Sequence, residues 1–486
     1  MMKRRQFVKT GLAAAVLAGA GSTGLFLLNK KSLVSTAYAG EFTTPLPIPA
    51  LLENLDKSGR TAQFKMAALE GKRTFLPGKI TPTFGYNGDF LGPTIRVRNG
   101  QRFNLQVTNN LPEVTTLHWH GMHLPAKWDG GPRQPIPPGT TWNPDFTIKQ
   151  PAATLWYHPH AMGKTGEQVY HGLAGLVLVE DEVSDRLDIP KNYGVDDIPV
   201  VIQDRRFFAD GRFAYVQSMH EVMNGVIGNY MLVNGAMSPT LSVDKQRIRL
   251  RLLNGSNSSI YKISFSGQPF QMIASDGGFL DRPVSLTSIL LSAGERAEVI
   301  LDLSSLKGKK LSMLVDQRGG DRFDALQIDV AETLQSSNNI PQVLEKVARI
   351  PESEADYTRR FVMQSMGMGM MGGGRLTING KKMDINRIDE KVKLGTTEIW
   401  EITNKSSMMM SMPHSMHLHD VQFQILDRDG RRPPVHEQGR KDTVLIQPGE
   451  TVRIISRFLD YKGVYMYHCH LLEHEDDGMM GQFEVV

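Results

Sequence analysis

The chain has 486 residues, of which 22% are charged, and its formal net charge at neutral pH is +4. This length accommodates about three domains of ordinary size, each with a core of its own. Residues 1–39 hold six basic side chains and no acidic ones, so the rest of the chain has a net charge of −2, which is +4 minus 6. A chain with this charge has no basic face for nucleic acid, and we exclude nucleic acid as a partner.

Residues 1–39 are predicted to be a twin-arginine export signal. Lys3–Phe7 (KRRQF) precede a weakly apolar run rich in Ala and Gly, and Ala37–Ala39 form a small-x-small cleavage pattern. The twin-arginine export machinery exports proteins that are already folded, so we expect an exported protein. A periplasmic location is favoured over an extracellular or cell-surface one. An uncleaved membrane anchor is the alternative, but the run is too weakly hydrophobic to favour stable membrane insertion.

The remainder is predicted to be all-β. Glycine (46) and proline (26) are frequent, and few stretches have the periodicity of an amphipathic helix. Short runs that alternate or stay apolar lie between turn signals, which is typical of β-sandwiches. These runs are 94–98, 102–107, 175–179, 198–202, 248–253 and 451–455.

Three segments follow the same plan and are predicted to be domains. Their bounds are 41–195, 196–335 and 355–486, and a polar linker covers 336–354. Each segment has a strand that runs into an asparagine, and the three instances are Val107–Asn110, Leu253–Gly255 and Ile402–Asn404.

Four His-x-His pairs carry the metal chemistry. They are His118/His120, His158/His160, His417/His419 and His468/His470. One such pair is weak support for a metal, but four pairs among only 14 histidines are hard to explain as core or surface residues. With His414 and His474 they make ten candidate ligands. The remaining histidines are interpreted as ordinary surface or core residues: His123, which lies nearest to a motif, His171, His220 and His436.

The segment Tyr465–His470 is predicted to be a strand and contains Cys469, the only cysteine. Successive side chains of a strand point to opposite faces, so His468 and His470 share one face and Cys469 occupies the other. This arrangement suits two metal centres joined by a short covalent path. A thiolate, two imidazoles and a weak thioether are the ligands of a blue-copper site, and His474 and Met479 follow directly downstream.

The ligand types favour copper over other metals. Structural zinc prefers several cysteines in a closed tetrahedron, and non-haem iron takes a carboxylate in its ligand triad. The first and third segments each supply two His-x-His pairs and the middle segment supplies none. Eight imidazoles that meet between the end segments could therefore hold three copper ions.

The chain resembles the three-domain multicopper oxidases, and among them the bacterial cuprous (copper-efflux) oxidases and bacterial laccases. The motifs that carry this resemblance are His118–Gly121 (HWHG), Trp156–His160 (WYHPH), His414–His419 (HSMHLH) and His468–His474 (HCHLLEH) with Met479. The resemblance implies three cupredoxin-like Greek-key β-sandwich domains. It also implies four copper ions, one of type 1, one of type 2 and two of type 3.

The same resemblance implies a role for each ligand. The type 1 copper would take His414, Cys469, His474 and the axial Met479, and the type 2 copper would take His118 and His417. The type 3 pair would take His120, His158, His160, His419, His468 and His470. The family usually has proline and glycine where this chain has Ser415 and Asp420, and we expect Ser415 to loosen the backbone near His414.

The implied reaction is the reduction of O₂ to two waters by four electrons, each taken from the substrate at the type 1 site. Electrons would pass from Cys469 to its covalent neighbours His468 and His470. Asp129 and Glu475 lie where related oxidases keep acids that orient a ligand or supply protons. The alternatives are a simple Asp-Gly turn for Asp129 and a solvated loop acid for Glu475.

Methionines are concentrated in two groups, 363–371 and 408–412, and the second directly precedes His414. Thioethers favour Cu(I), although a Met/Gly stretch is also typical of a flexible low-complexity loop. We therefore expect a monomeric oxidase that turns Cu(I) into Cu(II) for copper tolerance and also accepts phenols and diamines. One alternative is a laccase-type oxidase of phenols, Mn(II) or Fe(II) without a copper-efflux role.

A second alternative is a non-enzymatic copper-binding or division-associated scaffold on the same fold. Copper-free relatives of that kind lose their ligands, whereas all ten candidate histidines and Cys469 are present in this chain.

Overall fold

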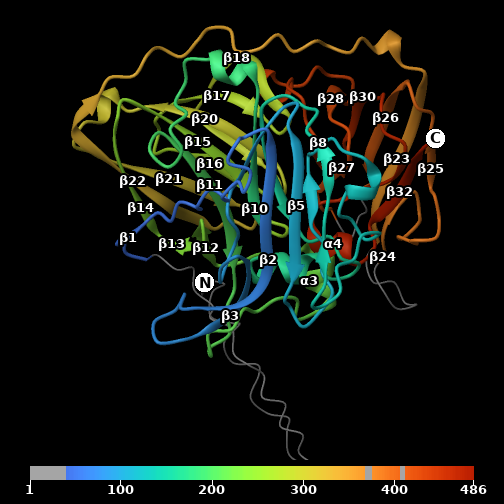
Figure 1. Cartoon of the computed structure of the whole chain (residues 1–486), viewed down its shortest axis with the longest axis horizontal. Coiled ribbons are helices and arrows are strands. Elements are labelled where there is room, and N and C mark those ends of the chain that lie inside the picture. Colours follow the sequence, from blue (N-terminus) through green and yellow to red (C-terminus); the bar gives the residue numbers. More distant parts are fainter. Residues whose placement is uncertain (1–39, 367–374, 406–410) are drawn as a thin grey trace, which may run out of the picture. The chain divides into compact units, whose positions relative to one another are not determined.

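The computed structural model describes residues 40–366, 375–405 and 411–486 (Figure 1). The predicted export signal and most of both methionine groups lie outside these residues. The described part is built from short strands with a few short helices, as predicted. None of the helices in the described ranges combines the length and the apolar character that crossing a membrane requires.

The six sheets form three pairs that follow chain order, and each pair encloses a core. In the first pair, one sheet has the order β3 (Thr81–Tyr86), β2 (Thr61–Arg73), β5 (Arg102–Asn109) and β7 (Thr141–Trp142), with β8 (Asp145–Thr147) also on β5. The other has the order β4 (Ile95–Arg98), β10 (Gly175–Glu180), β9 (Ala153–His158) and β6 (His118–His120). The sequence of β2 explains its strand conformation. Ala62, Phe64 and Met66 alternate with exposed polar residues, so their side chains share one face and fill this core.

The second pair has the sheets with the most strands, six and seven. One has the order β1 (Thr44–Pro45), β14 (Pro239–Lys245), β22 (Arg322–Gln335), β21 (Lys310–Gln317), β16 (Tyr261–Ser264) and β19 (Ser288–Leu291). The other has the order β13 (Ala236–Met237), β12 (Tyr230–Val233), β11 (Asp197–Arg205), β15 (Arg247–Asn254), β20 (Arg296–Asp302), β17 (Phe270–Ser275) and β18 (Gly278–Leu286). Strand β1 belongs by sequence to the first segment but pairs here, through Thr44 with Pro239.

The third pair carries the cysteine. One sheet has the order β24 (Arg375–Ile378), β23 (Tyr357–Met366), β26 (Thr396–Lys405), β30 (Thr451–Phe458) and β28 (Phe423–Arg428). The other has the order β25 (Glu390–Val392), β32 (Met480–Val485), β31 (Gly463–Cys469), β27 (His414–Leu418) and β29 (Thr443–Ile446). The predicted linker connects β22 to β23 along one edge (Figure 1).

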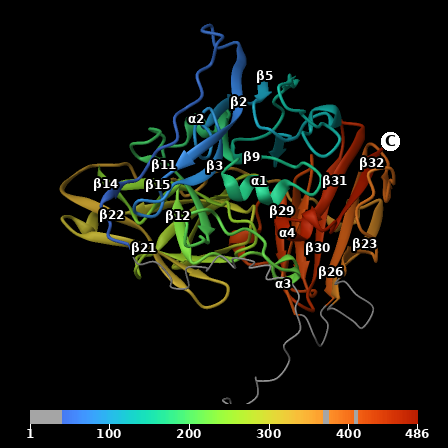
Figure 2. The same ribbon diagram turned by 90° about the horizontal axis from the view of Figure 1, so that it is seen from below.

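Short helices bring the three segments together near the cysteine. Helix α4 (Leu472–Asp476) contacts both α1 (Thr165–His171) and α3 (Met219–Asn224), and these helices come from three different segments (Figure 2). The remaining helical turns are α2 (Glu182–Arg186), η1 (Ala126–Trp128), η2 (Ser304–Leu306), η3 (Glu352–Glu354) and η4 (Val435–Glu437).

Candidate metal centres

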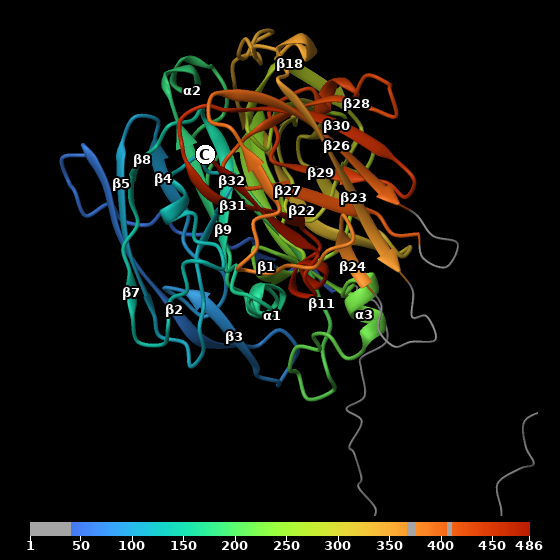
Figure 3. The same cartoon turned by 90° about the vertical axis from the view of Figure 1, so that its right-hand side faces the viewer.

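Strand register places the four His-x-His motifs opposite one another. In the first segment His118 of β6 pairs with His158 of β9. In the third segment His417 of β27 pairs with His468 of β31. Figure 3 shows β9 close to β27 and β31, and all eight of these imidazoles are buried. The histidines from the two ends of the chain therefore line one shared interior region.

Cys469 lies between two imidazoles. Its Sγ atom is 3.5 Å from Nδ1 of His414 and 3.5 Å from Nδ1 of His474. The other ring nitrogens face away, since Nε2 of His414 is 3.1 Å from the Ser365 hydroxyl and Nε2 of His474 is 3.1 Å from the Met223 carbonyl. The Met223 carbonyl requires the hydrogen of His474 to be on Nε2, and both outer contacts leave Nδ1 facing the sulfur, where it can bind a metal.

The chain turns back after α4 and brings Met479 to the cysteine. Gly478 has φ of +96°, a conformation that favours glycine, and ends the turn. The Cys469 N–H then donates to the Met479 carbonyl at 3.0 Å, and the Met479 N–H donates to the His474 carbonyl at 2.9 Å. Cys469, His474 and Met479 are all buried, so the downstream part of the motif folds against the cysteine as the strand-and-loop prediction requires.

Burial keeps these groups in their neutral forms. It lowers the pKa of His474 to about 4 and raises the pKa of the Cys469 thiol to about 12. The imidazole lone pairs are therefore available at neutral pH, whereas a thiolate requires a cation to take the place of the proton. One thiol with two neutral imidazoles suits a soft metal ion such as copper.

A second cluster joins three imidazoles from both end segments. Nε2 of His468 lies 3.2 Å from Nε2 of His160 and 3.2 Å from Nε2 of His419. Burial lowers the pKa of all three imidazoles, so each ring is neutral and keeps one nitrogen without a hydrogen. Three buried nitrogens that converge in this way form a site for one metal ion.

A third cluster contains His120, His158 and His470. Nδ1 of His120 is 3.4 Å from Nε2 of His158, and the rings of His120 and His470 lie 4.7 Å apart. Both ring nitrogens of His470 are buried without a hydrogen-bond partner. Because buried polar atoms are nearly always bonded, such an orphaned imidazole indicates a missing ligand.

His118 and His417 form a matched pair. Nδ1 of His118 donates to the Asp129 carbonyl at 2.9 Å, and Nδ1 of His417 donates to the Asp442 carbonyl at 2.8 Å. The Nε2 atom of each ring is buried and has no partner. The two unpaired nitrogens, from the first and third segments, fit one further metal ion.

Asp129 does more than form a turn. Its Oδ2 atom accepts from Nδ1 of His419 at 2.8 Å, while its carbonyl holds His118. Gly130 follows with φ of +77°, and a Cβ there would lie 1.8 Å from the Leu117 carbonyl, so the tight turn requires glycine. The turn and the contact with the histidines are therefore both present, and the turn-only alternative is wrong.

Glu475 is a buried residue of α4 and not a solvated loop acid. Its carboxylate oxygens lie 3.3 Å from Nδ1 of His160 and 3.2 Å from Nδ1 of His468. Burial, followed by the neighbouring Asp476, raises the pKa of Glu475 well above its usual value. Burial and Asp420 likewise raise the pKa of Asp129. Both raised pKa values favour the protonated form of the carboxyl groups beside the histidines.

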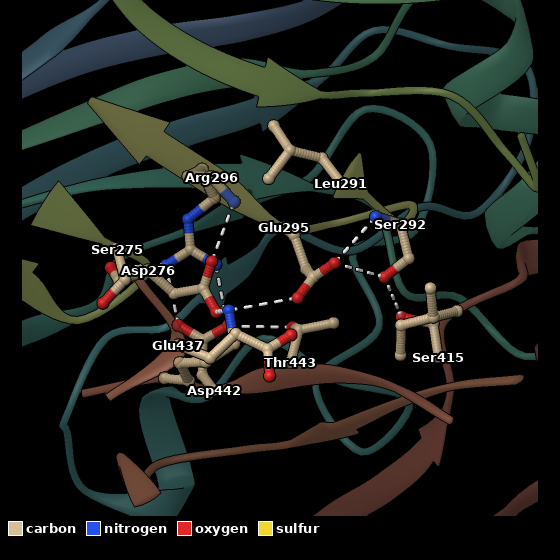
Figure 4. Close-up of polar contacts among 12 residues, drawn as sticks. Ser275, Asp276, Leu291, Ser292, Glu295, Arg296, Ser415, Glu437, Asp442 and Thr443 are labelled. Carbon is tan, nitrogen blue, oxygen red and sulfur yellow. Dashed lines mark hydrogen bonds and ion pairs between the residues drawn. The ribbon is translucent and has the colours of Figure 1, made fainter. Parts of the chain in front are cut away.

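Asp442 belongs to the site, although no sequence motif points to it. Its Oδ1 atom lies 3.0 Å from Nε2 of His120, which leaves Nδ1 of His120 for a metal. Arg296 of the second segment donates to both Asp442 oxygens, at 2.7 and 2.6 Å (Figure 4). The segment without ligands therefore supports a ligand through a fully buried ion pair. A lone aspartate 322 residues from its histidine carries no local signal that would have identified it.

Two further expectations need correction. Ser415 does not loosen the backbone, because it pairs with Leu445 of β29 and its hydroxyl lies 2.8 Å from that of Ser292 (Figure 4). Met363, the first residue of the methionine group 363–371, is not available as a Cu(I) contact, since it is fully buried in the core of the third sheet pair. The inward face of β23 needs an apolar side chain at this position.

The chain matches known proteins over nearly its whole length. Family models described as multicopper oxidase match residues 68–184, 206–330 and 351–486. The multicopper oxidase mco of Staphylococcus epidermidis is 40% identical over 438 residues, which are 90% of this chain and 91% of that protein. The cell division protein FtsP of Escherichia coli is 34% identical over 496 residues, which are 100% of this chain and 99% of that protein.

Solved structures give the same result. The crystal structure of a laccase from Pediococcus acidilactici is 37% identical, with a TM-score of 0.84, and the match covers 93% of this chain and 95% of that one. The all-β fold of three cupredoxin-like domains is thereby confirmed. The three matched ranges together span far more than half of the sequence. Every histidine of the clusters described above lies within the first or the third range. This chain therefore belongs to the multicopper oxidases, copper enzymes that use O₂ as the electron acceptor.

Proposed function

We propose that this oxidase is exported by the twin-arginine route, acts as a monomer in the periplasm, and oxidises Cu(I) to Cu(II) for copper tolerance. Phenols and diamines are further electron donors in this proposal. The observation that carries the choice of Cu(I) is an acidic, methionine-bearing pocket beside His474, one of the two imidazoles on Cys469.

We assign four copper ions to the four clusters. His414, Cys469, His474 and Met479 would hold the type 1 ion, and His118 and His417 would hold the type 2 ion. The type 3 pair takes His120, His158, His160, His419, His468 and His470. Copper, when bound, accepts electrons singly and stores the four that O₂ requires. The orphaned nitrogens of His118, His417 and His470 support this assignment.

The pocket lies where α1, α3 and α4 meet and has a volume of about 240 Å³. Four acidic residues line it and no basic residue does: Glu167, Glu473, Asp476 and Asp477. Its apolar and aromatic lining includes Tyr215, Val222 and Met219, whose side chain is exposed. Lys382 pairs with Asp477 at 2.7 Å from outside the lining. An acidic cleft raises the local concentration of cations, and a thioether favours Cu(I).

The pocket is coupled to the cysteine through α3. Met219 begins this helix, and the carbonyl of Met223, one turn later, accepts the hydrogen bond from Nε2 of His474. An electron from a donor in the pocket thus has a short route through His474 to Cys469. From there the main chain leads directly to His468 and His470 in the other clusters.

Protons reach the interior through the two buried acids. Asp129 holds Nδ1 of His419, and Glu475 lies between His160 and His468. Their raised pKa values favour protonated carboxyl groups, which would supply protons for the reduction of O₂. This division assigns proton delivery to Asp129 and Glu475 and electron delivery to Cys469.

The substrate is tested with two pocket variants, Met219→Leu and Asp477→Asn. We expect each to lower kcat/KM for Cu(I) by about tenfold, because one polar or soft contact to a small ion is removed. The kcat/KM for a neutral phenol should change by less than twofold. Glu332→Gln, at an exposed acid of β22 that does not line the pocket, is the matched control. An unchanged rate on Cu(I), or an equal loss on the phenol, would contradict the proposal.

The methionine groups require a separate experiment. Met363 is core and Met412 is buried with its sulfur accepting from Arg318, so neither is offered as a Cu(I) contact. A deletion should therefore be confined to residues 367–374, which lie outside the described residues. A lower rate on Cu(I) after this deletion, with an unchanged rate on phenols, supports a role in copper oxidation. Equal rates favour the alternative of a phenol, Mn(II) or Fe(II) oxidase.

The likeness to FtsP, a cell division protein, favours a division-associated role as the second candidate. The complete set of buried imidazoles around Cys469 and at the other clusters supports the oxidase instead. Oxygen uptake by the purified, copper-loaded protein in the presence of Cu(I) or a phenol separates the two. A protein that binds copper but consumes no oxygen would leave the scaffold as the remaining candidate.

A further inference from the structure

Arg318 lies at the tip of the β21–β22 hairpin and extends toward the cluster formed by His414, Cys469 and His474. Its Nη1 atom is 3.4 Å from the sulfur of Met412, and its Nη2 atom donates to the Asn224 carbonyl at 2.6 Å. Its Nε atom is buried without a hydrogen-bond partner. The guanidinium is thus held by a thioether and a carbonyl, which are both uncharged.

Arg318 has no acidic partner within the described ranges. No carboxylate there lies within ion-pair distance of it, and burial alone lowers the pKa of its side chain. Arg322, four residues further along the same hairpin, behaves in the ordinary way and pairs with Asp316 at the exposed surface. A half-buried cation without a counter-ion is costly, so its position calls for an explanation.

The two residues that contact Arg318 are close in sequence to residues of the cysteine cluster, which consists of His414, Cys469 and His474 with the Met223 carbonyl that holds His474. Asn224 directly follows Met223, whose carbonyl holds His474, and Met412 lies two residues before His414. Arg318 thus touches the residue that follows the carbonyl acceptor of His474 and the residue two positions before His414. The guanidinium therefore lies against the cluster from the side of the second segment.

We propose that Arg318 raises the reduction potential of the type 1 copper by placing an uncompensated positive charge beside it. This inference rests on the proposed assignment of His414, Cys469 and His474 as type 1 ligands. With one thiolate and two neutral imidazoles, the site carries one net positive charge with Cu(II) and none with Cu(I). A fixed cation nearby disfavours the more positive state, so uptake of one electron becomes easier.

The same contact has a consequence for substrates. The Met412 sulfur already accepts from a cation, so a second cation cannot approach it without meeting the guanidinium. Arg318 thus directs Cu(I) away from Met412 and leaves the acidic pocket at Met219 as the entry for cationic donors. A higher potential also widens the range of donors to phenols that are harder to oxidise.

The test is a redox titration of the blue absorbance of the copper-loaded, full-length protein. For Arg318→Gln we expect the one-electron equilibrium to shift toward Cu(II) by about tenfold, equivalent to about 59 mV. Arg318→Lys retains the charge and should restore most of the potential. Arg322→Gln removes the same charge from the same hairpin, where Asp316 already compensates it, and should leave the potential unchanged.

Asn224→Asp provides a second variant that keeps Arg318 and its packing. The Asn224 side-chain amide donates to the His220 carbonyl, so this variant puts a negative charge on the residue whose main-chain carbonyl holds the guanidinium, and we expect a shift in the same direction as for Arg318→Gln. A blue protein whose potential is the same in Arg318→Gln and Asn224→Asp as in the unmodified chain would overturn this inference. A wild-type protein that binds copper without any blue absorbance would instead overturn the type 1 assignment, so the two failures are distinguishable.

Discussion

Nδ1 of His123 lies 2.7 Å from Oδ1 of Asp420, a contact that joins the loop after the first histidine motif to the residue after the third. The other ring nitrogen of His123 is 2.8 Å from Asp460. Asp420 has φ of +68°, which explains why related chains place glycine there and what this chain gains from an aspartate. His123 is therefore a charged bridge between the first and third segments and not an ordinary surface or core histidine.

His123 should stabilise the protein in a pH-dependent way. Burial alone would lower its pKa, but Asp420 and Asp460 outweigh it and raise the pKa to about 9. A raised pKa in the folded state contributes stability that is complete below about pH 6.5 and is lost as pH rises through about 9. We expect His123→Gln to cost about 2 kcal/mol of unfolding free energy at pH 6, since bonds to charged groups are worth roughly that much.

Urea unfolding of the two proteins at pH 6, 8 and 10 measures this difference. The gap should narrow to near zero at pH 10. His220→Gln, at an exposed position on α3, is the control and should show little effect at any of these values. A gap of constant size across the range would mean that His123 acts through packing and not through its charge.

The parts of this site that the sequence could predict are those whose signal is local. The two histidines of each His-x-His pair lie two residues apart, and Met479 follows Cys469 by ten residues. Strand alternation correctly separates Cys469 from His468. The links to His123 and Asp442 could not be predicted, because their partners lie hundreds of residues away and each is a lone charged residue. Met363 was misinterpreted because composition dominated its neighbourhood, whereas its own strand position required a core side chain.

Truncation distinguishes the core methionine from the pocket methionine. Met363→Ala should lower the free energy of unfolding by about 2–5 kcal/mol, because it leaves a cavity in a fully buried position. Met219→Ala removes an exposed side chain and should change stability by less than about 0.5 kcal/mol. Denaturant unfolding of both variants at one copper loading provides the comparison. An unchanged free energy of unfolding in Met363→Ala would indicate that β23 is not packed as described.

Asp442→Asn should weaken both the fold and the metal site. The change leaves the buried Arg296 with only the more distant carboxylate of Asp276, 3.8 Å away, and breaking a buried ion pair typically costs about 3–5 kcal/mol. It also alters the group that holds Nε2 of His120, and such changes commonly reduce metal affinity by about 10–100-fold. Asp316→Asn, which breaks the exposed pair with Arg322, should cost no more than about 1 kcal/mol. Copper content and unfolding free energy are measured on the same samples of both variants. Equal losses in Asp442→Asn and Asp316→Asn would contradict this prediction.

The metal-free protein should lose stability in mild acid. Burial lowers the pKa of His468 and His474 to about 4 and that of His158 to about 3. Because a lowered pKa means that the unfolded chain takes up protons first, stability is present above about pH 6.5 and is lost as pH falls toward 4. Urea midpoints of the copper-free protein between pH 7.5 and 4.5 test this. A flat profile over this range would show that the imidazoles are not buried in the metal-free state.

Cys469→Ser tests the connection between the two kinds of centre. A serine hydroxyl is a poor replacement for a soft thiolate, so we expect the blue absorbance to disappear and one copper per chain to be lost. The imidazole clusters take no ligand from residue 469 and should keep their copper, which metal analysis and the remaining near-ultraviolet absorbance can check. Substrate-driven oxygen uptake should fall to background, because electrons would no longer reach His468 and His470 through the main chain. Uptake that survives in a variant shown to lack the blue centre would refute the proposed electron route, since Cys469 is the only cysteine in the sequence.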